Sequence, residues 1–469
     1  MPYNFIDCNR DQPYLLPPSL RDWLPEDHLA WFILDVTSAM DLSEFYGRYR
    51  IDGWGGSAYK PSMMVSLLIY AYCIGERSSR KIERLCEVDI AFRVITANKI
   101  PDHCTISRFR KNNKKAIQAL FSQVLNLCAE AGLVNVGVVS IDGAKVKGDA
   151  SLAANRRLKS IEREVGKILK EAEAKDKEED ELFGPGRRGD ELPEELRNRK
   201  SRVARLKECK ERLDREQAEA KSRQQEKINQ RELEEKRTGK KKRGRKPKNP
   251  EEVIDKEAKA NVTDPDSRIM KTRAGYIQGY NAQAVVTKDQ IVIAAEVVQE
   301  ENDVHQLHPM LDRADENLQA IGVKDNIGVA LADAGYWSEA NTESNGPELL
   351  ISTTKDYKQR KAMKEKPSPR GRIPKDLSLR DRMERKLLTK RGRALYKKRS
   401  QTVEPVFGQI KEGQRFRQFM QRGREACNAE WKLACTTHNL LKLWRRLKEN
   451  KIQRHEMLGI GTVGVAATT

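Results

Sequence analysis

The chain has 469 residues and a formal net charge of +20. This length exceeds one ordinary hydrophobic core, so we expect two or three domains. The charge favours a polyanionic partner, most often nucleic acid, over a basic excess that serves solubility alone. The eight cysteines include no CxxC pair, and no signal-peptide core or membrane-length apolar run is present. We therefore expect a cytoplasmic protein with reduced cysteines and exclude a zinc ribbon and a membrane span.

Residues 1–132 have the pattern of a helical N-terminal domain. The apolar stretch PSMMVSLLIYAYCIG (61–75) predicts a buried helix with Pro61 in its first turn. A further helix is expected over 78–95, and Thr105 is the expected N-cap of a long amphipathic helix. A helix-turn-helix and a plain helical domain with a solvated basic face both fit this pattern. In the first case DNA would be contacted by Arg108, Arg110 and Lys111.

Residues 153–260 are highly charged and nearly without aromatic side chains. Two apolar seams flank the turn GPGRRGD (184–190), which predicts an antiparallel helical hairpin inserted between two strands of the next domain. The first seam is Leu158, Ile161, Val165, Ile168 and Ala172, and the second is Leu196, Val203, Leu206 and Leu213. The hairpin ends in GKKKRGRKPKNP (239–250), which is too charged and Pro-rich to pack. We expect this arm to bind DNA phosphates through Lys242, Arg243 and Arg245.

Residues 133–152 and 261–449 carry the pattern of one catalytic domain, and 450–469 that of a flexible tail. NVGVVSIDGAKVK (135–147) predicts a strand that ends in Asp142. A strand hairpin over 280–298, a helix over 303–320, a buried strand ending in Asp333 and a strand over 348–355 should follow. The last elements are a long helix, from about 379 or 390 to 412, and one from about 425 to 449.

This order of elements is that of an RNase H-like α/β fold, a mixed sheet flanked by helices. In that fold the strands ending in Asp142 and Asp333 are parallel neighbours, so their carboxylates would lie side by side. Adjacent carboxylates repel each other unless they share a divalent cation, and oxygen ligands favour Mg²⁺ or Mn²⁺. Glu404 on the long helix is the candidate third acid. At about 100° per residue, it shares one helix face with Tyr396, Arg399 and Lys411, although an ordinary solvated Glu404 also fits.

The chain resembles the DDE transposases of bacterial insertion sequences, most closely the group named after IS1182. Nearly the whole chain is covered, through blocks such as YKPSMMVSLLIYAYCIGERSSRKIE, SIDGAKVKGDAS, LADAGYWSEAN and RALYKKRSQTVEPVFGQIK. The resemblance implies Asp142, Asp333 and Glu404 as catalytic residues and ligands of Mg²⁺, for which Mn²⁺ would substitute. It also implies that Tyr396, Arg399 and Lys411 form a DNA-binding signature around the Glu.

Two positions depart from the pattern of that family. Four residues instead of three separate Arg399 from Glu404, which makes the role of Arg399 less defined than that of Glu404. Asp149 stands where a neutral residue is expected, and it would either crowd the metal site or be solvated. Asp264 and Asp266 are expected to form Asx-Pro turns outside the site.

The function implied by the resemblance is transposition. Such a protein would bind the terminal inverted repeats of an insertion sequence, cut at its ends and join them to target DNA, with a homodimer acting in the DNA complex. The chemistry would be metal-dependent phosphoryl transfer. A catalytically inactive DNA-binding regulator and a metal-dependent nuclease remain alternatives.

Overall fold

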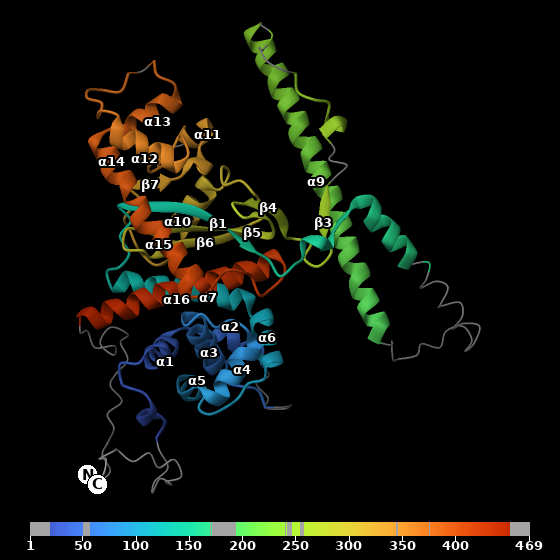
Figure 1. The fold of residues 1–469 in the computed structure, drawn as a ribbon, viewed down its shortest axis with the longest axis vertical. Coiled ribbons are helices and arrows are strands. Elements are labelled where there is room, and N and C mark those ends of the chain that lie inside the picture. Colours follow the sequence, from blue (N-terminus) through green and yellow to red (C-terminus); the bar gives the residue numbers. More distant parts are fainter. Residues whose placement is uncertain are drawn as a thin grey trace, which may run out of the picture.

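The computed structural model describes residues 19–49, 57–168, 170, 194–239, 241, 246–253, 258–343, 346–374 and 376–450. The buried apolar side chains of these residues form a large cluster and a small one. The large cluster runs from the N-terminal helices through the central sheet, and the small cluster lies in the charged insertion. Figure 1 shows the insertion projecting as a long arm from the rest of the chain.

The centre of the fold is a six-stranded mixed sheet with the order β4-β5-β1-β7-β8, in which β6 also pairs with β5. The strands are β1 (Val138–Lys147), β4 (Arg268–Thr272), β5 (Gly275–Thr287), β6 (Val292–Val298), β7 (Val329–Ala332) and β8 (Glu348–Ile351). Strand β1 is antiparallel to β5 and parallel to β7, which is parallel to β8. A mixed sheet of this order, flanked by helices, fits the predicted RNase H-like fold.

Strand β1 is longer than predicted and does not end at Asp142. Its antiparallel ladder with β5 continues until Lys147 pairs with Gly279. Its parallel ladder with β7 is much shorter and ends where Ser140 pairs with Leu331. Asp142 is therefore paired with β5 but lies just beyond the last residue of β1 that pairs with β7. The β7 side of β1 at Asp142 is the position where a site can form.

The edge strand β6 is covered by α16 (Arg424–Asn450), which supplies amide side chains to its backbone. Asn439 accepts a hydrogen bond from Val292 N and donates one to Val292 O, both at 2.9 Å. Asn428 accepts from Val297 N at 2.9 Å. Unpaired edge groups would otherwise be open to another chain. Helix α10 (Leu307–Ala320) also contacts β6, through Asn317 and the Ile293 carbonyl at 2.8 Å.

The described part of residues 20–130 forms helices and no strand. These are a short 3-10 helix (Leu20–Trp23), α1 (Leu29–Ala39), α2 (Ser43–Tyr46), α3 (Pro61–Cys73), α4 (Ser79–Val88), α5 (Ile90–Ile95), α6 (His103–Asn112) and α7 (Lys114–Glu130). As predicted, α3 begins at Pro61 and is buried along most of its length. Helices α3 and α7 pack against α16. The large hydrophobic cluster spans both parts, and the domain division near residue 132 remains a prediction.

The predicted helix start at Thr105 is wrong. The N-cap is Asp102, whose carboxylate accepts the Thr105 backbone N–H at 3.0 Å. An Asp at this position satisfies an N–H group that has no partner within the helix. The predicted long helix is also interrupted, because α6 ends at Asn112 and α7 begins at Lys114.

The predicted long helix from 379 or 390 to 412 is divided into segments: α13 (Leu379–Leu388), α14 (Lys390–Lys397), α15 (Arg399–Gly408) and a π turn (Gln409–Gly413). Thr389 caps α14 by accepting the Gly392 N–H at 2.9 Å. Pro405 has no N–H to give to Gln401, and the Gln401 carbonyl instead accepts from Gln290 Nε2 at 2.8 Å. The π turn interrupts the regular α-helical spacing from which Glu404 and Lys411 were predicted to share one helix face.

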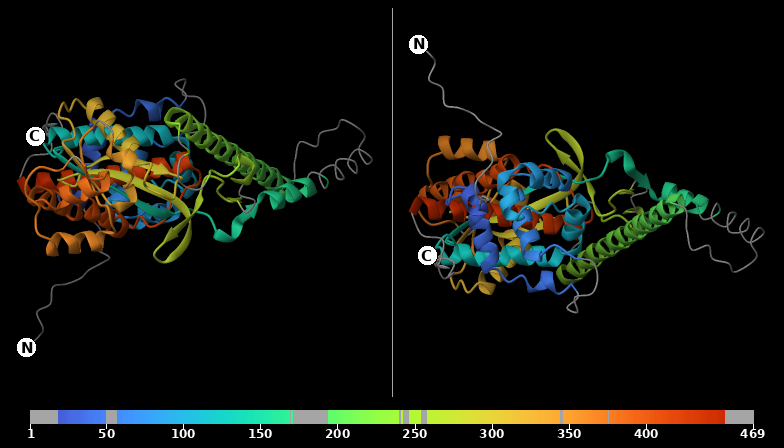
Figure 2. Two further views of the ribbon diagram at one scale, coloured as in Figure 1. Left: turned by 90° about the horizontal axis from the view of Figure 1, so that it is seen from above. Right: turned by 90° about the horizontal axis from the view of Figure 1, so that it is seen from below.

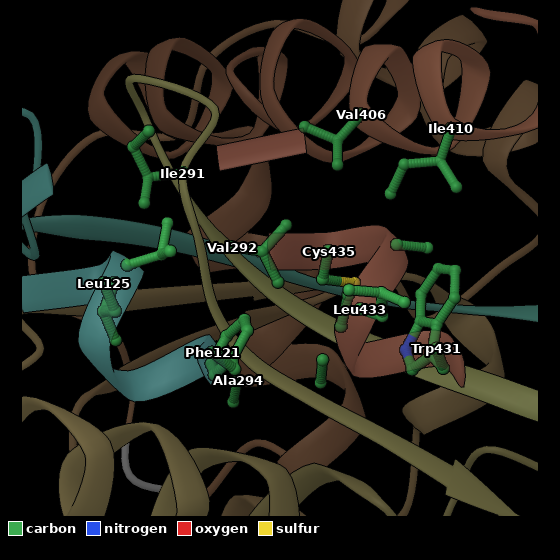
Figure 3. Close-up of a cluster of buried hydrophobic side chains, with 14 of the residues drawn as sticks. Phe121, Leu125, Ile291, Val292, Ala294, Val406, Ile410, Trp431, Leu433 and Cys435 are labelled. Carbon is green, nitrogen blue, oxygen red and sulfur yellow. The ribbon is translucent and has the colours of Figure 1, made fainter. Parts of the chain in front are cut away.

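Figure 3 shows how these last helices are held to the sheet. Val406 and Ile410 point from α15 and the π turn toward Trp431, Leu433 and Cys435 of α16. Val292 and Ala294 of β6, and Phe121 and Leu125 of α7, belong to the same buried cluster. The helix that carries Glu404 is thus packed on the same core as the strands.

Within the described residues, the insertion contains two helices that pack against each other. Residues 158–168 are helical, and α9 (Glu194–Thr238) packs against them. Arg202 pairs with Glu164 and Lys210 with Glu162, so the two helices run in opposite directions. Leu158, Ile161, Val165 and Ile168 share one cluster with Leu206 and Leu213. Ala172, the Leu196 side chain and the turn 184–190 lie outside the described residues.

The base of the insertion is tied to the chain segment that leads into strand β4. Strands β2 (Asn155–Arg157) and β3 (Lys259–Asn261) pair there, and the buried Arg212 of α9 donates to the carbonyls of Lys259, at 3.1 Å, and Pro265. The end of the basic arm also packs, contrary to expectation. Gln224 of α9 donates to the Lys248 carbonyl at 2.7 Å, and Lys221 pairs with Glu251. In both views of Figure 2, α9 extends away from the sheet.

Candidate active site

Asp142 and Asp333 extend from neighbouring parallel strands at matching positions. The ladder between β1 and β7 ends with Ser140 opposite Leu331, and each Asp lies two residues further along its strand. Asp333 directly follows β7 and caps a short 3-10 turn by accepting the Gly335 N–H at 2.8 Å. The structure therefore brings these two predicted acids to the same edge of the sheet.

Both carboxylates are in an environment that disfavours their negative charge. Burial raises the pKa of Asp142 to about 7, and the positive charge of Arg399 opposes this shift. Burial also raises the pKa of Asp333, again opposed by Arg399. Desolvated carboxylates close to one another are stabilised by a shared cation.

Glu404 is connected to Asp142 through the side chain of Arg399. Arg399, at the start of α15, is 5% exposed; its Nη2 lies 2.8 Å from Asp142 Oδ2, and its Nη1 lies 3.3 Å from Glu404 Oε1. Arg360 of α12 (Asp356–Glu365) donates to the same Glu404 oxygen at 3.0 Å and pairs with Asp356 at 2.7 Å. The guanidinium of Arg399 thus lies between the first and third predicted acids.

Within the described part of the chain, no group of three or more His, Cys, Asp or Glu side chains is arranged to hold a metal ion. Arginines contact one oxygen of Asp142 and one of Glu404, and Asp333 Oδ1 accepts the Gly335 N–H. Their donor chemistry still fits a hard divalent cation, which prefers carboxylate oxygens. Burial destabilises the anionic forms of Asp142 and Asp333, and Arg399 supplies part of the positive charge that they need.

Of the other residues of the predicted signature, Tyr396 and Arg399 are buried, and Lys411 is partly exposed. Tyr396 of α14 is buried, and burial raises its pKa to about 12. The Lys411 ammonium lies 5.9 Å from the centre of the Phe407 ring, a cation–π arrangement. Arg399 faces the carboxylates, so in this structure it is not presented to a phosphate.

Only part of the predicted basic surface on α6 is exposed. Arg108 and Lys111 are exposed. Arg110 is 6% exposed and donates to the Arg77 carbonyl at 2.7 Å and to the Tyr72 hydroxyl at 3.3 Å. These internal contacts direct Arg110 away from any DNA on the surface. The predicted arm residues Lys242, Arg243 and Arg245 lie outside the described residues.

A further acid at the site, Asp303, was missed in the sequence. It lies between β6 and α10, and its Oδ1 accepts from Asn281 Nδ2 at 2.7 Å and Gln283 Nε2 at 2.6 Å. The Tyr336 hydroxyl donates to Gln283 Oε1. Asp303 lies in the loop between β6 and α10, where the sequence has no hydrophobic periodicity that would draw attention to it. The signal that was available is Asn281 and Gln283, two of the three amides of strand β5, which are buried in the fold.

The remaining acids have structural roles. Asp264 is buried and accepts from the Tyr280 hydroxyl at 2.8 Å and from Gly423 N at 3.2 Å. Asp266 accepts from Arg424 N at 2.9 Å, so the VTDPDSR turn caps the start of α16. Asp149 pairs with Arg422 at 2.9 Å, and its side chain is 44% exposed, in agreement with the solvated alternative.

Comparison with known families adds to this geometry. Residues 18–112 match a family model described as Transposase domain (DUF772), and residues 355–444 match one described as Transposase DDE domain. No curated protein and no solved structure matches the chain. The first match includes α1 to α6, and the second includes Arg360, Arg399 and Glu404. No helix of the described residues is long and apolar enough to cross a membrane.

The mixed sheet flanked by helices, together with the DDE match, fits an RNase H-like fold. The two matches support a DDE transposase, with DNA as its partner. Domains of this type generally use a divalent metal ion, in agreement with the carboxylate chemistry at the edge of the sheet.

Proposed function

We propose that the chain is a transposase of the group named after IS1182. It binds the terminal inverted repeats of an insertion sequence and catalyses metal-dependent DNA cleavage and strand transfer. The observation that carries this proposal is the placement of Asp142 and Asp333 at matching positions of parallel strands, with Glu404 linked to Asp142 through Arg399.

Asp142, Asp333 and Glu404 would hold Mg²⁺, with Mn²⁺ as a substitute. When bound, the metal would lower the pKa of the attacking hydroxyl and neutralise charge on the scissile phosphate. The chain's own residues provide positioning. Two acids come from strands whose spacing is fixed by the ladder, and Glu404 comes from a helix packed on the same core. Such preorganisation supplies much of the rate in phosphoryl transfer.

DNA ends would bind to the N-terminal helices, with the exposed Arg108 and Lys111 of α6 on phosphates. We expect the cleaved DNA strand to be bound by Tyr396, Arg399 and Lys411. For Arg399 this requires release from Asp142 and Glu404, which a phosphate can bring about by competing with the carboxylates for the guanidinium. Two copies of the chain would pair the two ends of the element.

One observation favours an inactive DNA-binding regulator as the second candidate. Arg399 and Arg360 both engage Glu404, and the described acids do not form a metal-holding group. The test is incubation of the purified protein and Mg²⁺ with DNA carrying the inverted repeats that flank its gene. A transposase nicks at the repeat ends and leaves random DNA intact. Binding without nicking would establish the regulator, and equal cutting of random DNA a nuclease.

A further inference from the structure

Gly143 and Gly335 lie close to the predicted catalytic acids Asp142 and Asp333. The space beside both glycines is bordered by the carboxylate of Asp303. A Cβ added to Gly143, next to Asp142, would overlap the Gln283 amide and lie 2.7 Å from Asp303 Oδ1. A Cβ added to Gly335, next to the Asp333 turn, would lie 3.0 Å from Asp333 Oδ1 and 3.3 Å from Asp303 Oδ2. Any larger residue at either position would therefore crowd the Asp303 carboxylate, which borders the same small space as Asp333.

The two oxygens of Asp303 have different surroundings. Oδ1 is held by the Asn281 and Gln283 amides at 2.7 and 2.6 Å. Oδ2 accepts no hydrogen bond from the described residues and faces the space next to Gly335 and Asp333. One oxygen therefore fixes the carboxylate, and the other is left available to a ligand.

The segment that carries Asp303 is also held in place. The Gln306 N–H donates to the Asp303 carbonyl at 2.9 Å, and Asn341 Nδ2 donates to the Val304 carbonyl at 2.7 Å. Asn281 Nδ2 reaches the Glu300 carbonyl at 3.2 Å. The carboxylate is thus positioned by β5 and by the turn before α10, independently of Arg399 and Glu404.

A second oxygen near Asp303, the Asn281 Oδ1 beside Gly143, has no hydrogen-bond partner among the described residues. Asn281 is 1% exposed, and its Oδ1 makes no hydrogen bond with the described residues. Both Asn281 Nδ2 contacts are to acceptors, so the amide cannot be turned round without placing oxygen against oxygen. Oδ1 lies 2.9 Å from the Cβ position of Gly143, on the side of the sheet where Asp303 lies. A buried acceptor without a donor is costly unless a cation or a water satisfies it.

We infer that Asp303 is a fourth carboxylate of the cation site, with Oδ2 facing the ion next to Asp333 and Asn281 Oδ1, which has no partner among the described residues, lying beside Asp303 Oδ1. The inference rests on the proposed function, because it assumes a divalent cation held at Asp142 and Asp333. Hard cations take carboxylate and amide oxygens together. Because Glu404 is paired with Arg360 and Arg399, Asp303 would be the third carboxylate ligand beside Asp142 and Asp333 when no DNA is bound.

The test is a calorimetric titration of the full chain with Mn²⁺, without DNA. Asp303→Asn removes the charge and should weaken Mn²⁺ binding by about tenfold or more. Asp303→Glu keeps the charge on a longer side chain and should retain more Mn²⁺ affinity than Asp303→Asn. The matched control is Asp312→Asn, which removes one charge from an exposed position on α10 and should leave Mn²⁺ binding unchanged. Melting curves in EDTA check that each variant folds.

A second variant tests the position without changing any charge. Gly335→Ala places a methyl group in the space between the Asp333 and Asp303 oxygens, and should weaken Mn²⁺ binding as well. If Asp142→Asn lowers Mn²⁺ affinity but Asp303→Asn and Gly335→Ala bind as the wild type does, the inference fails and the proposed function stands. If the wild-type chain takes up no Mn²⁺, both are overturned.

Discussion

The Arg399 guanidinium lies 2.8 Å from Asp142 Oδ2 and 3.3 Å from Glu404 Oε1, and so bridges acids that are far apart in the chain. The side chain of Arg399 is 6% exposed, which makes it a structural cation in this arrangement. A partly desolvated carboxylate such as Asp142 depends on such a partner. The same contact holds α15 against β1, next to the Ser140–Thr402 hydroxyl pair at 2.6 Å.

The variant Arg399→Gln should therefore lower the free energy of unfolding by about 3 kcal/mol, because it leaves Asp142 without its partner. The measurement is urea unfolding in EDTA. Adding Asp142→Asn to Arg399→Gln should restore part of the loss, since the unpaired charge is then gone. Equal stability of Arg399→Gln and the wild type would show that the bridge is not structural.

Substitutions of the exposed and of the buried basic residues of α6 should affect DNA binding and folding separately. The double variant Arg108→Ala/Lys111→Ala should keep its melting temperature and bind the terminal repeats more weakly, with a salt slope smaller by about 2. The variant Arg110→Ala should instead lower the melting temperature, because it removes buried hydrogen bonds to Arg77 and Tyr72. The measurements are thermal melts and DNA binding across a salt series. An unchanged salt slope in the double variant would remove α6 from the DNA surface.

The buried His438 predicts a loss of stability in acid. Burial lowers its pKa to about 4 in the folded chain, from an ordinary value of 6.5, and its Nε2 lies 2.9 Å from the Gln290 carbonyl. The unfolded chain binds the extra proton first, so the free energy of unfolding falls as pH drops from about 6.5 to about 4. The contribution of His438 reaches about 3 kcal/mol.

The measurement is urea unfolding at several pH values between those limits. His438→Gln should remove most of this pH dependence, whereas His305→Gln, at an exposed position, should keep it. If the wild type and His438→Gln lose stability in parallel, other groups cause the acid sensitivity.

The insertion should be dispensable for folding of the catalytic part but needed for transposition. Its apolar seam forms a cluster of its own, separate from the cluster of the sheet. Replacement of residues 153–260 by a short Gly/Ser linker should leave a cooperative melt, while transposition falls steeply. A loss of cooperative unfolding would mean that the insertion is structural, and full transposition would mean that its basic arm is passive. Arg212→Ala, which loosens the base of the hairpin without deleting it, is the milder companion variant.

The sequence was sufficient where local pattern and chain order decide the structure. The order of strands, the pairing of Asp142 with Asp333 and the hairpin seam follow from periodicity and from the geometry of parallel strands. It was insufficient where distant contacts decide. Asp303 lies in a connection, and its importance depends on amides from β5 and on the space left by Gly143 and Gly335.

Helix boundaries near the site show the same limit. The division of the last helix follows from the cap at Thr389 and from Pro405, whose effect is compensated by Gln290, a residue more than 100 positions earlier. Likewise, the inward direction of Arg110 and Arg399 depends on partners from other elements. A basic residue in a helical pattern is compatible with a surface role and with a buried ion pair, and tertiary packing chooses between them.

The most direct test of the central claim is strand cleavage of the terminal repeats with Mg²⁺ by Asp142→Asn, Asp333→Asn and Glu404→Gln. Asp149→Asn serves as the control, because its acid pairs with Arg422 away from the site. Each of the first three should lose cleavage by more than about a hundredfold while still binding the repeats, since each removes a proposed metal ligand. Asp149→Asn should cleave as the wild type does. Cleavage by Asp333→Asn near the wild-type rate would contradict the account.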